Sequence, residues 1–335
     1  SKLNESLYFI DYHSLNDSQK SHFDLCNCYQ NKNIELLDLA YQGLKNGYIS
    51  SKKQDLPFSN DLSEVTIYEE YIFIRRMFKW FWIYYVLLIR LISLNNPFKE
   101  LVAFISTMNV RKIDFKAFKY STSMYKVFSS KLVNQNPFVS IVLPTLNRYE
   151  YLANALKDLE EQNYKNFEVL IVDQSESFNK NFYNKFDLKI QVIKQNEKLL
   201  WLARNKAIKL SKADFILFYE DDVRVKPDWI FNHLKTIDFF KCQISTGVFI
   251  GENQNTSSIK SKFHLASQFS SANSMVKKNI FKKIGLFDRQ FEKMRMGDGE
   301  FGARCVKNGF LIVSNPNSLC IDVKAPVGGL RYFGS

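Results

Sequence analysis

The second half of the chain alternates short apolar runs with segments of helical spacing. Runs of strand length occupy Phe138–Pro144, Phe167–Asp173, Leu188–Lys194 and Asp214–Glu220. Apolar residues at helical spacing lie between these runs, in Tyr149–Gln162 and Leu199–Ser211. Strands that alternate with helices predict βαβ units, and hence an α/β fold whose mixed, mainly parallel sheet is flanked by helices. In such sheets, ligands bind beyond the carboxyl ends of the strands.

The first 136 residues lack this alternation. Asn33–Tyr48 is a helix candidate and Ser50–Asp61 reads as a loop. Tyr71–Ser93 is strongly apolar, but its uninterrupted core runs only from Trp80 to Ile89, whereas a membrane-spanning helix needs about twenty apolar residues. Two interpretations stay open: a buried helix, which we favour, or a helix lying in a membrane interface. We therefore expect a mainly helical domain over 1–136 and a sheet domain over 137–335.

The composition is that of an ordinary globular protein. The chain has 335 residues, of which 46% are hydrophobic, a length typical of about two domains. Five cysteines without framework spacing favour reduced thiols and a cytoplasmic setting. The N-terminus shows no basic-then-apolar signal segment, and the four histidines form no zinc-ligand pattern.

Positive charge concentrates between the two regions. The net charge is +12, and residues 71–136 hold eleven Lys and Arg residues against only Glu100 and Asp114. In Arg111–Lys131, aromatic residues interleave with the bases. Such a surface attracts anions, which predicts peripheral contact through residues 71–131 with the inner face of the cell membrane. The sequence contains no nucleic-acid-binding motif, so no nucleic acid partner is expected.

Three adjacent carboxylates follow one apolar run. In FILFYEDDVRVKPDW, Glu220, Asp221 and Asp222 come directly after a strand candidate. The common explanation of such a cluster is a solvated acidic turn. The alternative is a site for Mg²⁺ or Mn²⁺, because these cations prefer carboxylate oxygens and complete their shells with water and substrate phosphates. On a strand end Glu220 and Asp222 would point the same way, and Asp221 the opposite way.

Five ordered motifs between Phe138 and Arg331 resemble those of the family-2 inverting glycosyltransferases, which have the GT-A fold. In chain order, they are SIVLPTLNRYEYLANALKDL, FEVLIVDQSE, LARNKAIKLSKADFILFYEDDV, SSANSMVKKNIFKKIGLFDRQF and GDGEFGARCVKNGF. The resemblance implies transfer of a sugar, from a UDP-sugar above all, to a hydroxyl of a glycan, polysaccharide or glycolipid. It also implies a Mn²⁺ or Mg²⁺ cofactor.

The resemblance assigns roles by position. On the acceptor side, Asp298 would be the general base and Glu300 would hold the acceptor or neighbouring groups. Asp222 would be the direct metal ligand. The donor would be bound by residues of the first strand end and loop, the base contact, the diphosphate side and the acidic turn: Pro144, Thr145, Asn147, Arg148, Asp173, Arg204, Glu220 (near the ribose) and Asp221 (orienting the turn).

The chain departs from the family pattern in three places. Glu220 replaces the first aspartate of the DxD pair, and Gly297 stands where an acid normally precedes the base. The C-terminal segment Cys320–Arg331 lacks the histidine that often serves the metal or diphosphate, so Asp322 would replace it as a ligand and Lys324 or Arg331 would hold the diphosphate. Because of Gly297, a second hypothesis remains: a catalytically degenerate binding module that docks to a membrane or a partner synthase. Asp298 and Glu300 could then simply favour the start of a helix.

Overall fold

The chain forms two compact units. The computed structural model describes residues 6–7, 12–46, 48, 54–55, 65–115, 123–252, 263–266, 268–292, 294 and 296–323. Contacts divide the chain into Ser1–Ser121 and Thr122–Ser335. The division falls before the expected boundary at 136/137, so α6 (Ser123–Val127) and α7 (Lys131–Asn134) belong to the sheet unit. There the Ser130 hydroxyl and the Leu132 N–H donate to the Asp238 carboxylate, at 2.7 and 3.1 Å.

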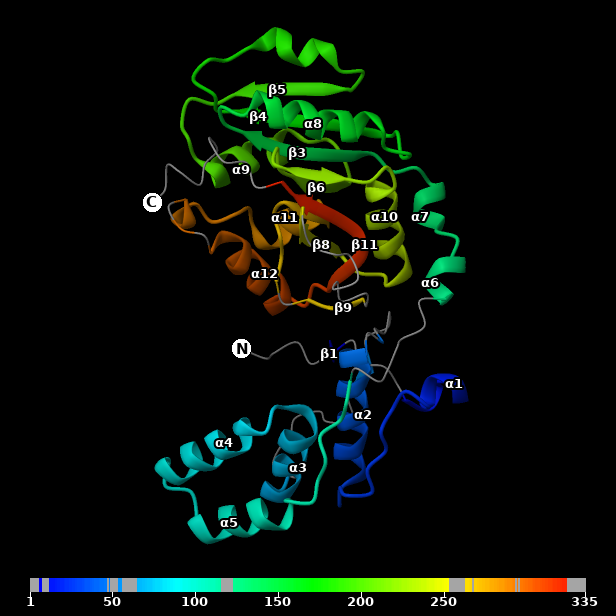
Figure 1. The fold of residues 1–335 in the computed structure, drawn as a ribbon, viewed down its shortest axis with the longest axis vertical. Coiled ribbons are helices and arrows are strands. Elements are labelled where there is room, and N and C mark those ends of the chain that lie inside the picture. Colours follow the sequence, from blue (N-terminus) through cyan, green and yellow to red (C-terminus); the bar gives the residue numbers. More distant parts are fainter. Residues whose placement is uncertain are drawn as a thin grey trace. The chain divides into compact units, whose positions relative to one another are not determined.

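The first unit is mainly helical (Figure 1). Its helices are α1 (Asp17–Lys20), α2 (Lys32–Asn46), α3 (Ile67–Met77), α4 (Phe81–Ile92) and α5 (Pro97–Ser106). A 3-10 turn, η1 (Tyr12–Ser14), precedes α1, and β1 (Ser6–Leu7) pairs antiparallel with β2 (Gln54–Asp55). The buried Arg76 side chain fastens α3 to α2, because its Nε and Nη2 donate to the two carboxylate oxygens of Asp38.

The apolar stretch Tyr71–Ser93 is not one helix. α3 ends at Met77 and α4 begins at Phe81. Phe78 between them is extended, at φ −111° and ψ 172°, and its ring packs against Tyr41 and Phe73. The break thus gives Phe78 aromatic partners that a continuous helix would not offer.

The prediction of a buried helix fits α3, in which Tyr71, Ile72 and Met77 are buried, but it is wrong for α4, in which only Ile83 is buried. No helix among the described segments is both long enough and apolar enough to cross a membrane.

The second unit is built on a mixed sheet. The order of its described strands is β5-β4-β3-β6-β10-β8-β11-β7, and β9 pairs with β11. The strands are β3 (Val139–Thr145), β4 (Phe167–Asp173), β5 (Ile190–Lys194), β6 (Phe215–Tyr219), β7 (Val223–Val225), β8 (Ile244–Gly251), β9 (His264–Leu265), β10 (Asn273–Lys277) and β11 (Ile312–Asp322). β3 to β6 are parallel, as expected, whereas β10 runs antiparallel to β6 and β8.

Helices and 3-10 turns connect and flank these strands. They are α8 (Tyr149–Glu160), η3 (Lys180–Lys185), α9 (Leu200–Leu210), α10 (Trp229–Phe239), α11 (Asn279–Ile284), η5 (Arg289–Phe291) and α12 (Gly297–Lys307). Four elements agree with the bounds predicted from sequence to within two residues at each end, namely the strands β3 and β4 and the helices α8 and α9. Since the parallel strands end at one edge, the residues that follow them gather there.

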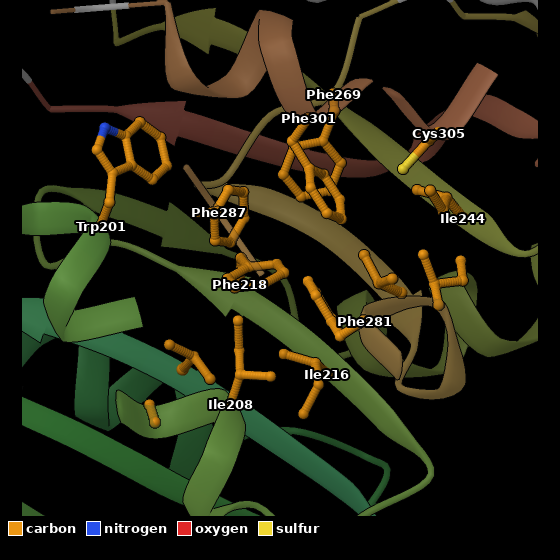
Figure 2. Close-up of a cluster of buried hydrophobic side chains, with 14 of the residues drawn as sticks. Trp201, Ile208, Ile216, Phe218, Ile244, Phe269, Phe281, Phe287, Phe301 and Cys305 are labelled. Carbon is orange, nitrogen blue, oxygen red and sulfur yellow. The ribbon is translucent and has the colours of Figure 1, made fainter. Parts of the chain in front are cut away.

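An aromatic cluster fixes α9 and α12 to the sheet. One group of packed rings contains Phe218 of β6, Phe281 of α11, Phe287 of the loop after α11 and Phe301 of α12. Trp201 of α9 belongs to the same cluster (Figure 2). The Phe281 and Phe301 rings stack with centroids 5.3 Å apart. Aromatic pairs at such distances add stability beyond the area they bury. The cluster therefore holds the N-terminus of α12, where Asp298 lies, in a fixed place on the sheet.

The cysteines differ in part from expectation. Cys26 and Cys28 form a disulfide, whereas the sequence predicted reduced thiols. Cys242, Cys305 and Cys320 are free and buried. Burial raises the pKa of the Cys242 and Cys305 thiols to about 12.

Candidate active site at the carboxyl ends of the strands

The acidic turn after β6 is buried and internally paired, not a solvated turn. Asp221 and Asp222 are 6% and 4% exposed. The turn that carries them is closed because the Tyr219 hydroxyl donates to the Val223 carbonyl, at 2.9 Å. The Val323 N–H, just beyond β11, donates to the Asp222 carbonyl at 3.1 Å. Neighbouring strands therefore hold the backbone of the acidic turn on both sides.

One arginine joins the two aspartates. Nη1 of Arg148 lies 3.2 Å from Asp221 Oδ1 and 2.9 Å from Asp222 Oδ2. The Thr145 hydroxyl, at the end of β3, donates to Asp221 Oδ2 at 2.6 Å. Burial raises the pKa of Asp221 to about 7, and the charge of Asp222 adds to this effect, while the Thr145 hydrogen bond and Arg148 oppose it. The structure thus brings these residues together, and Asp221 and Asp222 share one partner instead of pointing in opposite directions. The link through Arg148 could not be read from spacing.

A second network connects the acidic turn to α12. Nη2 of the fully buried Arg204 donates to Glu220 Oε1 at 2.7 Å and to the Ser271 carbonyl at 3.0 Å. The Ser271 N–H in turn donates to Asp298 Oδ2 at 3.2 Å. Ser271 therefore links the arginine that we placed on the diphosphate side to the expected base. No sequence signal singled out Ser271, since its contribution is entirely through the backbone.

Both ends of this network retain unused hydrogen-bonding capacity. Within the part of the chain that the structure describes, Arg204 Nε and Nη1 and Asp298 Oδ1 are buried without a partner. A buried polar group without a partner costs about 1–3 kcal/mol, and more when it is charged. The site therefore offers two donors and one carboxylate oxygen that a ligand could satisfy.

The loop after β3 is tied to the loop after β4. Asn147 has a φ of 54°, a left-handed conformation that asparagine tolerates better than most residues. Its N–H donates to the Ser175 hydroxyl at 2.8 Å, and its Oδ1 accepts from the Glu176 N–H at 3.0 Å. Pro144 and Thr145, the last residues of β3, are buried beside this loop.

Asp173 is fully buried and held by the chain itself. Its Oδ2 accepts from the hydroxyls of Tyr149, at 2.6 Å, and Tyr183, at 2.8 Å, and its Oδ1 accepts from the Ser175 N–H at 2.8 Å. Burial, and then the Asp173 charge, raise the pKa of Tyr183, so this tyrosine stays a hydrogen-bond donor. Sequence reasoning missed both tyrosines, which shape the wall where a base was expected to bind.

Three expected site residues remain: Glu300, Asp322 and Arg331. Both oxygens of Glu300 accept from Arg304, each at 2.7 Å, one turn further along α12. Arg304 also donates to the carbonyls of Ile284 and Leu286, so the pair braces the preceding loop. Asp322 is the last residue of β11 and pairs with Val223 in the antiparallel ladder, which sets it beside the acidic turn. Arg331 lies outside the described residues, as does Lys324, its alternative.

The structure shows what surrounds Gly297, the glycine that stands where the family normally has an acid before the base. A Cβ atom at Gly297 would lie 2.2 Å from Cζ2 and 2.3 Å from Cε2 of Trp201. The indole itself is anchored, because Trp201 Nε1 donates to the Phe291 carbonyl at 2.9 Å. The carboxylate of Glu292 accepts hydrogen bonds from the backbone N–H groups of Trp201 and Leu202 at the start of α9, at 3.0 and 2.8 Å. The ring therefore occupies the space where a side chain at position 297 would begin.

The described residues contain no group of three or more His, Cys, Asp or Glu side chains arranged to hold a metal ion. Mg²⁺ and similar ions usually need only one or two carboxylates, because phosphates and water supply the other ligands. The two carboxylates that such binding would use are those of Asp222 and of Asp322, which pairs in the ladder with the next residue, Val223.

Comparison with known proteins identifies the sheet unit. Residues 140–303 match the family model described as glycosyl transferase family 2. The sheet unit belongs to glycosyl transferase family 2. This confirms the resemblance drawn from the five motifs, since the matched region begins in β3 and ends in α12.

Curated relatives of this chain are named as glycosyltransferases. The putative glycosyltransferase EpsH of Bacillus subtilis is 31% identical over 106 residues, 30% of this chain and 31% of EpsH. A Methanococcus voltae protein named dolichyl N-acetyl-alpha-D-glucosaminyl phosphate 3-beta-D-2,3-diacetamido-2,3-dideoxy-beta-D-glucuronosyltransferase is 26% identical over 210 residues, 54% of this chain and 65% of that protein. The chain thus spans less than two thirds of the length of either relative.

Among solved structures, residues 1–349 of S. aureus TarS in complex with UDP-GlcNAc align with a TM-score of 0.50 and 19% identity. The alignment covers 58% of this chain and 60% of that one. This likeness supports the GT-A fold.

Proposed function

We propose that the protein transfers a sugar, with inversion, from a nucleoside-diphosphate sugar to a hydroxyl of a glycan, polysaccharide or glycolipid. A UDP-sugar is the first donor to test. Family membership supports sugar transfer in general. Among the curated relatives, the Escherichia coli protein WcaA is named for colanic acid biosynthesis, and the Methanococcus voltae protein for a dolichyl-phosphate-linked sugar. These names support a polymeric or lipid-linked acceptor for this chain.

The observation that carries this proposal is the unpaired oxygen of Asp298. Its Oδ2 is held by the Ser271 N–H, whereas Oδ1 is buried without a partner among the described residues. A carboxylate fixed through one oxygen and unpaired at the other is suited to accept a proton from a substrate hydroxyl. Asp298 is thus oriented and keeps one oxygen without a partner.

The reaction would proceed in one displacement. The acceptor oxygen attacks the anomeric carbon, the bond from that carbon to the diphosphate oxygen breaks, and the hydroxyl proton passes to Asp298 Oδ1. A single displacement without a covalent intermediate inverts the anomeric centre. Arg204 lies at the opposite end of the Ser271 link, and its unpaired Nε–H and Nη1–H are suited to a diphosphate, whose charge grows as it leaves.

A divalent cation belongs to the same proposal. Asp222, with Asp322 beside it on β11, would hold Mn²⁺ or Mg²⁺, which acts as a Lewis acid on the departing diphosphate. Arg148 now donates to the Asp222 oxygen at 2.9 Å, and it would turn to the donor phosphates when Asp222 binds the ion. Glu220, Asp221 and Asp173 would complete the nucleotide side of the pocket.

The test compares Asp298→Asn with wild type under a matched control. We expect the variant to lose transfer by about 10²–10⁴-fold, the usual contribution of a general base. Its thermal stabilisation by a nucleotide sugar with Mn²⁺ should remain, since donor binding does not use this oxygen. Asp187→Asn, at an exposed acid of the same unit, serves as the control and should keep full activity.

Four results would contradict the proposal or parts of it. Full transfer by Asp298→Asn would exclude its role as base, and full transfer after thorough chelation would exclude the metal. Retention of the donor's anomeric configuration in the product, read by NMR, would exclude inversion. Absence of both transfer and donor hydrolysis in the wild type would favour the degenerate binding module instead. The Gly297 departure motivates that alternative, although Trp201 fills the space beside it.

We also propose that this transfer takes place at a membrane surface. Exposed apolar side chains concentrate on two helices of the first unit, α4 and α5. The acceptors suggested above include lipid-linked sugars, which reside at such a surface.

A further inference from the structure

We infer that α4 and α5 together form a hydrophobic face that inserts into the boundary between headgroups and acyl chains of an anionic phospholipid bilayer. This deepens the proposed function, because it assigns the membrane contact to particular side chains. It rests on that function only for its biological purpose, since membrane binding is measurable without donor, acceptor or transfer.

The first unit leaves this face uncovered, although the face is unusually apolar. Its most exposed members include Leu94 at 93%, Phe98 at 80% and Trp80 at 77%. Apolar residues exposed by more than a third on the two helices are Phe81, Trp82, Tyr84, Tyr85, Leu88, Ile89, Ile92, Phe98, Leu101, Val102 and Ile105. Single exposed apolar residues are ordinary, but a contiguous group of this size marks an interaction surface.

Two of the three charged side chains on these helices, Arg90 and Glu100, point inward, whereas Lys99 of α5 is exposed. Arg90 of α4 pairs with Glu70 of α3 and lies 3.5 Å from Glu100 of α5, and Glu100 is only 2% exposed on its side chain. The Tyr71 hydroxyl donates to Glu100 at 2.8 Å beneath the same contact. A surface helix in water shows the opposite arrangement, with its charged face outward. The outward face of α4 and α5 is therefore built for an apolar environment.

The face is held rigidly by its own small core. Ile83 of α4 and Ala103 of α5 pack with Tyr71 of α3 in one buried cluster. Figure 1 shows α3, α4 and α5 as neighbours within the first unit. Both helices thus present their apolar residues from a common support.

Charge and residue type favour a lipid surface over a second protein. The start of α4 carries Trp80 and Tyr84, and such rings prefer the headgroup level. A hollow of about 170 Å³ there is lined by both rings together with Arg75, Lys79 and Lys112, among other residues. Cations beside interfacial aromatic rings suit an anionic phosphate headgroup. α4 has 12 residues, so it is about 18 Å long and would lie along the membrane plane instead of crossing it.

Flotation with vesicles tests this with the whole 335-residue chain. Wild type should bind vesicles of equal parts phosphatidylglycerol and phosphatidylcholine, and should bind phosphatidylcholine vesicles far less. Leu88→Ser with Val102→Ser should lower the partition coefficient at least about tenfold, because two exposed aliphatic side chains no longer enter the lipid. The matched control is Leu25→Ser with Val306→Ser, which changes the same residue types at similar exposure elsewhere.

A second pair of variants isolates the charge. Lys79→Gln with Lys112→Gln should lower binding to the anionic vesicles about tenfold, whereas Lys209→Gln with Lys307→Gln should leave it unchanged. Circular dichroism and thermal melting confirm that each variant is folded.

Four outcomes would overturn the inference. They are no binding of wild type to anionic vesicles, equal binding to both kinds of vesicle, unchanged binding of the Leu88 and Val102 variant, or a wild-type dimer in lipid-free solution that this variant dissociates. The last result would make the face a contact between copies of the chain. Loss of transfer activity with intact vesicle binding would count against the proposed function alone.

Discussion

Replacing Gly297 by alanine tests the packing beside the proposed base. The added Cβ would lie 2.2–2.9 Å from three atoms of the Trp201 ring, whereas ordinary carbon contacts are 3.4–4 Å. The ring must therefore move by more than about 1 Å, against its hydrogen bond to Phe291 and its contact with Phe287, whose centroid is 5.0 Å away.

The cost follows from these contacts. Overpacking a core costs about 1–3 kcal/mol, and weakening the indole hydrogen bond adds about 1 kcal/mol. The better helix propensity of alanine offsets little of this at the first helical position. We expect Gly297→Ala to lower the free energy of unfolding by about 2–4 kcal/mol, measured by urea denaturation with an unchanged m-value.

Two further variants make the reasoning refutable. Gly299→Ala, two residues on in the same helix, places its Cβ 3.6 Å from the nearest atom, Met296 Cε, and should change stability by less than about 0.5 kcal/mol. In a Trp201→Leu background the penalty of Gly297→Ala should vanish, since the obstructing ring is gone. A Gly297→Ala protein as stable as wild type, or a penalty that persists with Trp201→Leu, would refute the clash.

Two other predictions concern stability and pH. Burial lowers the pKa of His233 to about 4, against the hydrogen bonds to Asn273 and Ser245, so the unfolded chain binds a proton that the folded one does not. The free energy of unfolding should therefore fall by up to about 3 kcal/mol as the pH drops from about 6.5 to 4, and denaturation curves of His233→Gln should lack this fall. Glu300→Gln should lower the free energy of unfolding by about 0.5 kcal/mol, because it weakens the partly exposed ion pair with Arg304. The KM for the acceptor should not change, and a raised KM would instead assign Glu300 to acceptor binding.

The parallel half of the sheet was predictable from sequence for a physical reason. β3, β4 and β6 are buried at every position, so each reads as a continuous apolar run. β8 and β11 mix buried and partly exposed positions and include Gly247 and Pro316, so neither reads as a strand in the sequence. This mixed half of the sheet, in which β8 and β11 are parallel and β10 is antiparallel to β8, was therefore found only in the structure.

The site was predictable where chemistry demands a residue type, but not where packing or backbone decides. Asp221, Asp222 and Arg148 gather at the edge that the strand order implies. The roles of Ser271 and Trp201 depend on a backbone amide and on a close ring contact, neither of which leaves a pattern in the sequence. The break at Phe78 was missed for a similar reason, because its aromatic partner Tyr41 lies far away in the chain.

Ser271 has a consequence for how the two substrates influence each other. The peptide group on one side of its Cα holds Arg204, and the peptide group on the other side holds Asp298. A donor that draws the guanidinium toward its diphosphate pulls on the residue that orients the carboxylate. Under the proposed function, donor and acceptor binding would therefore be thermodynamically coupled through one residue, and by reciprocity an acceptor bound at Asp298 would change donor affinity by the same factor. A filled donor pocket would then help to orient the proposed base.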